Sequence, residues 1–122
     1  EEVQDLPAEL LALAACSTLT RLGAEIVGRS YGGGLLKLEP REAAILPVPS
    51  PTIIRAHQNE LSGLIQQARG LLAAGRRDDV QRLVDALLAP ALGLDEHDLT
   101  EMSALATTLH ARRRARGTRE RA

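Results

Sequence analysis

Apolar side chains recur along most of the chain at the spacing of α-helices. Leucine, isoleucine, valine and alanine repeat at i, i+3, i+4 and i+7 in residues 52–74, 78–89 and 99–109. Residues 7–27 are apolar on more than one stripe, which predicts a helix with neighbours on two sides. The pattern therefore predicts a mainly α fold with four helices.

Residues typical of helix ends flank these segments. Asp5 is the predicted N-cap of the first helix and Gly28 its left-handed stop, and Asp95 is the predicted N-cap of the last helix. Within the last segment, Gly117 should break the helix. We therefore expect helix to about Arg114 and a mobile end beyond it.

The helical pattern is interrupted by residues 30–51, "SYGGGLLKLEPREAAILPVPSP". The three glycines predict a sharp turn, residues 35–38 a short strand, and residues 39–44 one helical turn that has proline at its first position. Alternate prolines in residues 45–51 leave only one edge of an extended chain able to donate hydrogen bonds, which predicts an edge strand or a polyproline-like segment. We expect a short two-stranded β element between the first and second helices.

The composition favours a core of helices packed on helices. Aromatic residues make up 1% of the chain, with no Trp and no Phe, so the core must be built from aliphatic side chains. Gly63 and Gly70 are seven residues apart near one face of the second predicted helix. Because glycine lets two backbones come close together, this pair predicts a close approach by another helix.

The single cysteine and the apolar N-terminal segment bear on the compartment. Cys16 has no second cysteine with which to form an intramolecular disulfide, which fits a reducing compartment and a small buried apolar side chain. The surrounding "LLALAAC" is short and follows acidic residues, so it predicts neither a signal peptide nor a membrane span. We expect a cytoplasmic protein that makes no contact with a membrane.

Charge is distributed unevenly although the net charge is only −1. Residues 1–109 carry nine basic and fifteen acidic side chains, whereas residues 110–122 carry six arginines and one glutamate. With 122 residues, one domain is expected. Its predicted parts are a helix with the glycine-rich motif (residues 1–51), a three-helix part (52–116) and a flexible basic tail (117–122).

The residue patterns argue against a catalytic, cofactor or metal site. Glycine-rich phosphate-binding loops follow a strand and precede a helix, whereas "YGGG" follows a helix and precedes a strand. His57, His97 and His110 are far apart in the sequence and do not have the spacing of metal ligands. Two pairs of neighbouring carboxylates each open a predicted helix, where they complement its dipole.

The order of these elements resembles the C-terminal end of adenine-specific (N6) DNA methyltransferases of restriction-modification and phage-defence systems. In that family a late helix is followed by a glycine-bearing turn, "LKLEP", a short acidic helical turn and "LPVP", as here. The resemblance covers about residues 10–51 and is most specific in residues 31–49. It implies a C-terminal DNA-recognition or accessory domain.

The same resemblance implies that this chain does not catalyse methyl transfer alone. The family's Asn/Asp-Pro-Pro-aromatic motif and its glycine-rich methyl-donor loop are absent from this sequence. No catalytic or cofactor residue is therefore carried over to it. The parent enzyme is expected to be a site-specific adenine DNA methyltransferase that uses S-adenosylmethionine.

Two basic or glycine-rich segments are the candidates for contact with DNA. Backbone N–H groups of a glycine loop can approach a phosphate, and basic side chains add charge beside it. The glycine motif either contacts DNA or braces the recognition region, and the tail either binds phosphates or serves solubility and the helix dipole. The candidate DNA-binding residues are Arg29, Tyr31, Gly32, Gly33, Gly34, Lys37, Arg112, Arg113, Arg114 and Arg116.

A helical interaction module is the alternative function. If the second apolar face of the first helix is left uncovered, a partner subunit or a second copy of the chain would cover it, and we expect a homodimer. The two functions predict different surfaces. A DNA-associated domain should gather Arg29, Lys37 and the tail arginines on one side, whereas a docking module should expose a contiguous apolar patch.

Overall fold

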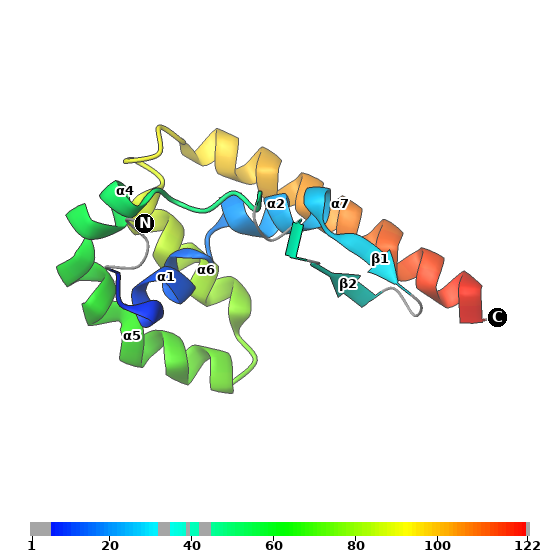
Figure 1. The fold of residues 1–122 in the computed structure, drawn as a ribbon, viewed down its shortest axis with the longest axis horizontal. Helices are drawn as coiled ribbons and strands as arrows, with labels where there is room; N and C mark the ends of the chain where they lie inside the picture. The colour runs from blue at the N-terminus through cyan, green and yellow to red at the C-terminus, as the bar shows by residue number, and fades with distance from the viewer. Residues whose placement is uncertain (1–5, 32–34, 39, 42–44, 122) are drawn as a thin grey trace.

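The computed structural model describes residues 6–31, 35–38, 40–41 and 45–121, and helices predominate in them (Figure 1). The described helices are α1 (Ala8–Ala14), α2 (Thr18–Val27), α4 (Pro51–Ala56), α5 (Gln58–Ala73), α6 (Arg77–Leu88) and α7 (Glu96–Arg121). The strands are β1 (Arg29–Tyr31) and β2 (Leu35–Lys37). The prediction of a mainly α fold is confirmed, but the predicted count of four helices is wrong because two of those helices are each broken.

The first break separates α1 from α2 at Ser17, and the two helices are bent by 79°. The Ser17 hydroxyl accepts a hydrogen bond from the Thr20 backbone N–H at 3.3 Å, and this makes Ser17 the N-cap of α2. The Asp85 carboxylate of α6 also caps this end, since it accepts a hydrogen bond from the Thr18 backbone N–H at 2.9 Å. The predicted single helix over residues 7–27 is therefore wrong. Its proposed cap, Asp5, lies outside the described residues.

The second break divides the predicted helix over residues 52–74 at His57, whose φ of −114° is not helical. Before it, α4 starts at a Ser50 N-cap whose hydroxyl accepts from the Ile53 N–H at 3.3 Å, and Pro51 fills its first turn. After it, α5 runs to Ala73, close to the predicted end at residue 74, and Gly75 follows with a left-handed φ of 74°.

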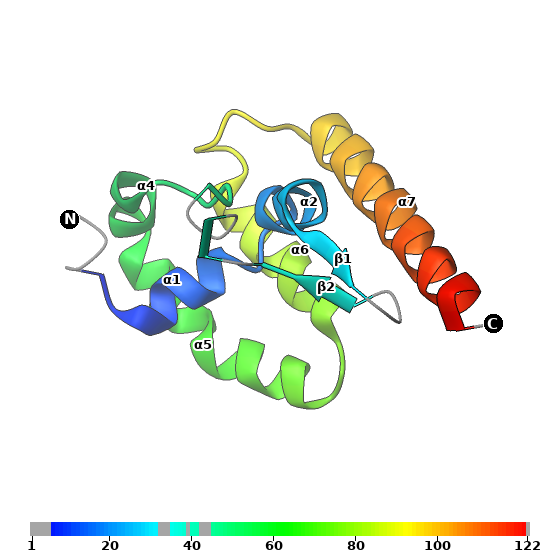
Figure 2. The same ribbon diagram turned by 45° about the vertical axis from the view of Figure 1, so that its right-hand side comes forward.

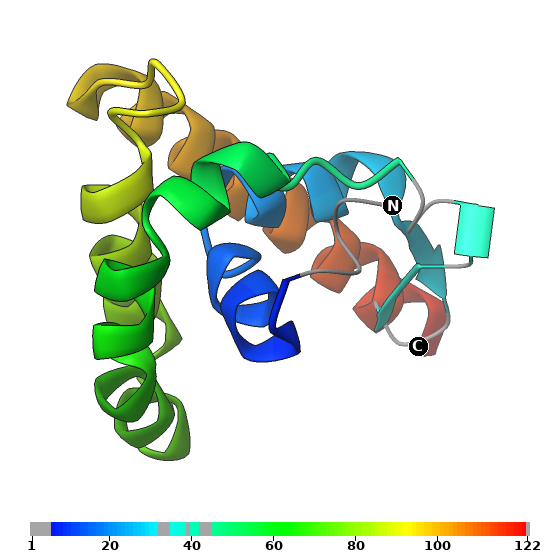
Figure 3. The ribbon, with the colours of Figure 1, turned by 60° about the vertical axis from the view of Figure 1, so that its left-hand side comes forward.

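The core lies where α1 meets α4, α5 and α6 (Figure 3). It is aliphatic, as the composition predicts. Its buried members are Leu6, Leu10, Leu13, Ala14, Ile54, Leu61, Ala68, Val80, Val84 and Leu88. Helix α7 lies outside this core and packs along α2, where its Ala106 is fully buried (Figure 2).

The β element is an antiparallel hairpin between α2 and α4, with Arg29 and Lys37 as register partners. The predicted strand at residues 35–38 is confirmed as Leu35–Lys37, and its partner is β1. Residues 46–50 belong to neither strand, so of the two alternatives for this segment the edge strand is wrong. The predicted glycine turn at 32–34 lies outside the described residues. Of the predicted helical turn at 39–44, only 40–41 is described, and it is helical.

The segment that carries the alternate prolines is held against α2. The Thr20 hydroxyl donates to the Pro47 carbonyl oxygen at 2.8 Å. A Cβ atom on Gly23 would lie 2.5 Å from Pro47 Cδ, so only glycine lets the proline ring come this close. The close approach that requires glycine occurs here, between the α2 backbone and a proline ring, and not at the glycine pair of α5.

The predicted start of α7 is confirmed, whereas the predicted ends of α2 and α7 are wrong. Asp95 Oδ1 accepts from the Asp98 N–H at 2.8 Å, and Asp98 Oδ2 accepts from the Asp95 N–H at 3.0 Å, which confirms the predicted cap. Gly28 has a φ of −72°, so it ends α2 in an extended conformation and not in the predicted left-handed one. Helix α7 continues past Gly117 to Arg121, because one glycine costs a helix only about 1 kcal/mol.

Replacing Gly63 or Gly70 by alanine should raise the free energy of unfolding by about 0.5–1 kcal/mol each. The predicted close approach at these residues is wrong: both are exposed, and a Cβ atom at either would meet nothing within 4 Å. Alanine therefore adds helix propensity without a clash. Urea unfolding of each variant measures the change.

Gly75→Ala is the matched control for this pair, because the φ of 74° at Gly75 strains any L side chain and should lower stability. A loss of stability in Gly63→Ala or Gly70→Ala would contradict the expectation.

Within the described part of the chain, no helix by itself has both the length and the apolar character needed to cross a bilayer. The bent pair α1 and α2 passes that test of length and composition only when its two helices are taken together.

Candidate nucleic-acid interface

The hairpin lies beside the arginine-rich half of α7 (Figures 1 and 2). A hollow of about 140 Å³ opens where they meet, and we call it the junction hollow. Its lining comes from α2, β2 and α7: Glu25, Gly28, Leu36, Leu109, Arg112, Arg113 and Arg116. Two segments that are far apart in the sequence thus form one surface, and both were candidates for contact with DNA.

The exposed basic side chains of this surface come from both segments. Arg112, Arg114 and Arg116 are exposed on α7, and Lys37 is exposed at the end of β2. Arg112 and Arg116 are four residues apart, so they lie on the same side of the helix. The fold therefore puts Arg112 and Arg116 in the lining of the junction hollow, and Lys37 next to Leu36, which also lines it.

Arg113 differs from its neighbours because its side chain is only 10% exposed. Its Nε donates to Glu25 Oε1 at 3.1 Å and a terminal nitrogen donates to Glu25 Oε2 at 2.8 Å. The same guanidinium lies 2.7 Å from His110 Nδ1. The sequence suggested Arg113 as a phosphate contact, but its guanidinium group is already bound to the Glu25 carboxylate of α2. We therefore assign it to the contact between helices.

The remaining candidates are placed only in part. Arg29 and Tyr31 lie in β1, and nothing is described of their side chains. Residues 32–34 lie outside the described part of the chain. Contact between these residues and DNA stays a prediction.

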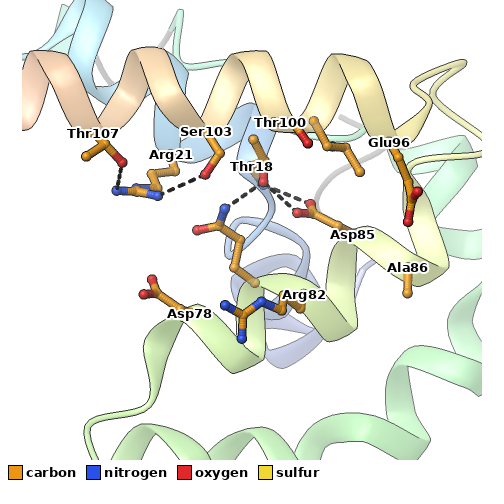
Figure 4. A pocket seen from close by; sticks show the side chains of 12 residues that line it. Thr18, Arg21, Asp78, Arg82, Asp85, Ala86, Glu96, Thr100, Ser103 and Thr107 are labelled. Carbon is orange, nitrogen blue, oxygen red and sulfur yellow. Dashed lines mark hydrogen bonds between the residues drawn. The ribbon is translucent and has the colours of Figure 1, made fainter.

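A polar groove of about 710 Å³ lies between α2, α6 and α7 (Figure 4). At its floor, the buried Thr18 hydroxyl donates to Asp85 Oδ2 at 2.5 Å, and Gln81 Nε2 lies 2.6 Å from the same hydroxyl oxygen. Arg21 reaches the hydroxyls of Ser103 and Thr107 at 3.5 and 3.3 Å. These polar groups form hydrogen bonds with one another, and the resulting network connects the three helices.

Sequence reasoning missed this network because its partners are remote from one another. Asp85 lies 67 residues from Thr18, and it stands in the last turn of α6, where the helical pattern gives no reason to single it out. The one local signal was the Ser17-Thr18 pair, because serine and threonine commonly start helices.

Among the described residues, no group of three His, Cys, Asp or Glu side chains could hold a metal ion.

The sequence predicts that Cys16 is a small buried side chain, but the structure buries it only in part. It is half-buried beside an apolar hollow of about 250 Å³ between α1 and α5. Burial raises the pKa of its thiol, and the nearby positive charge of Arg77 opposes that shift. A raised pKa keeps the thiol protonated at neutral pH, which does not favour a nucleophile.

Large apolar side chains are also exposed on α2 and on the segment that crosses it. Ile26 is 61% exposed, Ile45 65% and Val48 37%. Pro47, between the latter two, packs on Gly23, one turn before Ile26. We call these three exposed side chains the apolar strip, and it is the feature that bears on a docking function.

Comparison with known proteins gives one family. No curated protein and no solved structure matches the chain. A family model described as "Type II methyltransferase M.Eco57I, C-terminal domain" matches residues 2–89. The match covers α1 to α6 and the hairpin, and it confirms the resemblance seen in residues 10–51. The chain belongs to the family of the Type II methyltransferase M.Eco57I, C-terminal domain.

Proposed function

We propose that this chain is a DNA-recognition or accessory domain of an N6-adenine DNA methyltransferase and does not catalyse methyl transfer by itself. One observation carries the proposal: the hairpin and the arginine-rich half of α7 meet at the junction hollow. Lys37, Arg112 and Arg116 then serve as phosphate contacts at one place, as basic side chains do on DNA backbones.

The charge distribution supports a local contact. Nonspecific affinity for DNA rests on the number of phosphates that Lys and Arg neutralise, and the chain as a whole carries a net charge of −1. Residues 1–109 are acidic overall, so they repel a duplex. We therefore expect weak binding that is indifferent to sequence and confined to the basic junction.

The chemistry of methyl transfer belongs to the rest of the parent enzyme under this proposal. S-adenosylmethionine and the catalytic residues would be supplied there, since the sequence of this chain has neither motif. A cytoplasmic location belongs to the same proposal because the DNA substrate is there.

Changing Arg112 and Arg116 to glutamine should flatten the salt dependence of duplex binding. The slope of log K against log salt should fall by about two units, one for each phosphate that the variant no longer neutralises. Fluorescence anisotropy with a labelled duplex at several salt concentrations measures this slope.

The control is Arg69→Gln with Arg82→Gln, which removes the same charge from α5 and α6. Their side chains are 59% and 76% exposed, and their surface ion pairs contribute little to stability. An equal reduction of the slope in both variants, or no binding of the unaltered chain at low salt, would contradict the proposal.

A docking or dimerisation module is the second candidate function, and the apolar strip favours it. Burying Ile26, Ile45 and Val48 against a second copy or a partner subunit would remove apolar area from water. Sedimentation of the chain distinguishes the two: a dimer that Ile26→Glu dissociates supports docking, and a monomer at high concentration counts against self-association.

A further inference from the structure

We propose that the buried ion pair between Glu25 and Arg113 sets the rotation of α7, and so places Arg112 and Arg116 at the hairpin. Glu25 and Arg113 are then positioning residues for the DNA-contacting surface, and neither need touch DNA. This inference rests on the proposed function. It adds Glu25, and it gives Arg113 a role other than the phosphate contact that the sequence suggested. One of the two lies outside the residues matched by the family model.

The pair has the geometry of a rigid connection. Both nitrogens of the Arg113 fork engage both Glu25 oxygens, at 3.1 and 2.8 Å, and the two side chains are 10% and 8% exposed. A planar guanidinium bound in this way has one orientation, whereas a lysine ammonium has many. Because a guanidinium only donates, its 2.7 Å contact makes His110 Nδ1 the acceptor.

Apart from this pair, the apolar stripe of α7 is modest, since Leu99, Met102 and Leu109 are only partly buried. The fully buried residue at its centre is the small Ala106, and Arg21 reaches its two α7 hydroxyls at 3.3 and 3.5 Å. Leu105 is 46% exposed, so a helix turned by one residue could bury Leu105 in exchange. A buried polar pair is a known means of choosing one helix register among several of similar apolar burial.

The position of Arg112 and Arg116 follows from this rotation. Successive residues on a helix point about 100° apart. With Arg113 turned onto α2, Arg112 and Arg116 flank it on the side of the junction hollow, beside Gly28 and Leu36. A different rotation of α7 would carry both arginines away from the hairpin without changing the charge of the chain.

Arg113→Lys tests the inference because it keeps the positive charge and removes the guanidinium group that binds both Glu25 oxygens. It should weaken duplex binding about tenfold, which is 1.4 kcal/mol. Arg82→Lys is the control, since it makes the same change at an exposed position on α6, outside the hairpin and α7, and should leave affinity unchanged. Urea unfolding of both variants shows whether any weakening comes from unfolding. The double variant Glu25→Arg with Arg113→Glu reverses the pair and should recover most of the affinity.

A second readout in the DNA-free protein separates this inference from the proposed function. If α7 rotates, Arg113→Lys should shift the amide NMR signals of Gly28, Leu36 and Lys37, while Arg82→Lys should not. Those shifts in a chain that binds no duplex would uphold the placement of α7 and refute the DNA function. Identical affinity and identical amide signals in the two variants would overturn the inference.

Discussion

Replacing Leu61 by alanine should lower the free energy of unfolding by about 2–5 kcal/mol. Leu61 is 0% exposed and lies in α5 within the aliphatic core that α5 forms with α1 and α6. The variant loses the burial of the deleted atoms and leaves a cavity, because the surrounding helices relax only in part. Urea unfolding followed by circular dichroism measures the change.

Leu72→Ala is the matched control, since it deletes the same atoms from the same helix at a side chain that is 46% exposed. It should cost less than about 1 kcal/mol because nearly half of that surface already contacts water. Similar reductions in stability at the two positions would show that α5 does not pack on α1 as described.

Asp85→Ala should lower the free energy of unfolding by about 2–3 kcal/mol. The Asp85 carboxylate accepts from both the backbone N–H and the hydroxyl of Thr18, at 2.9 and 2.5 Å. Its removal leaves two donors of a residue that is 1% exposed without their acceptor. It also takes a negative charge from the N-terminus of α2, where the helix dipole favours one. Thermal or urea unfolding measures the effect.

Asp79→Ala, on the same helix, breaks two ion pairs to arginines that are 62% and 76% exposed, and should cost about 1 kcal/mol or less. Asp85→Asn keeps one acceptor oxygen, so its loss in free energy of unfolding should lie between those of Asp85→Ala and Asp79→Ala. A destabilisation at Asp85 no larger than that at Asp79 would contradict the role assigned to the Thr18 hydrogen bonds.

Periodicity predicted most of the helical fold but not its breaks. The predicted helix over residues 78–89 matches α6, and the Asp95 cap and the strand at 35–38 are also confirmed. The bend between α1 and α2 could not be read from the pattern, since the apolar residues continue through it. Its cause is partly a contact from Asp85, which lies 67 residues away.

The candidate interface was predicted by residue type but not by arrangement. A run of arginines and a glycine-rich segment are visible in the sequence, and both were named. Local patterns cannot show that α7 continues past Gly117, that it lies beside β2, or that Arg113 pairs with Glu25, 88 residues away. These facts separate Arg113 from the exposed arginines on either side of it.

Titration of an unlabelled duplex into the ¹⁵N-labelled chain tests the central claim most directly. The account predicts that amide signals of Gly28, Leu36, Lys37 and residues 109–116 shift together, and that added salt reverses the shifts. Signals of α4 and of the exposed face of α5 should stay in place. Shifts confined to the apolar strip or the polar groove, or no shifts at low salt, would contradict the claim that the hairpin and α7 form a DNA-contacting surface.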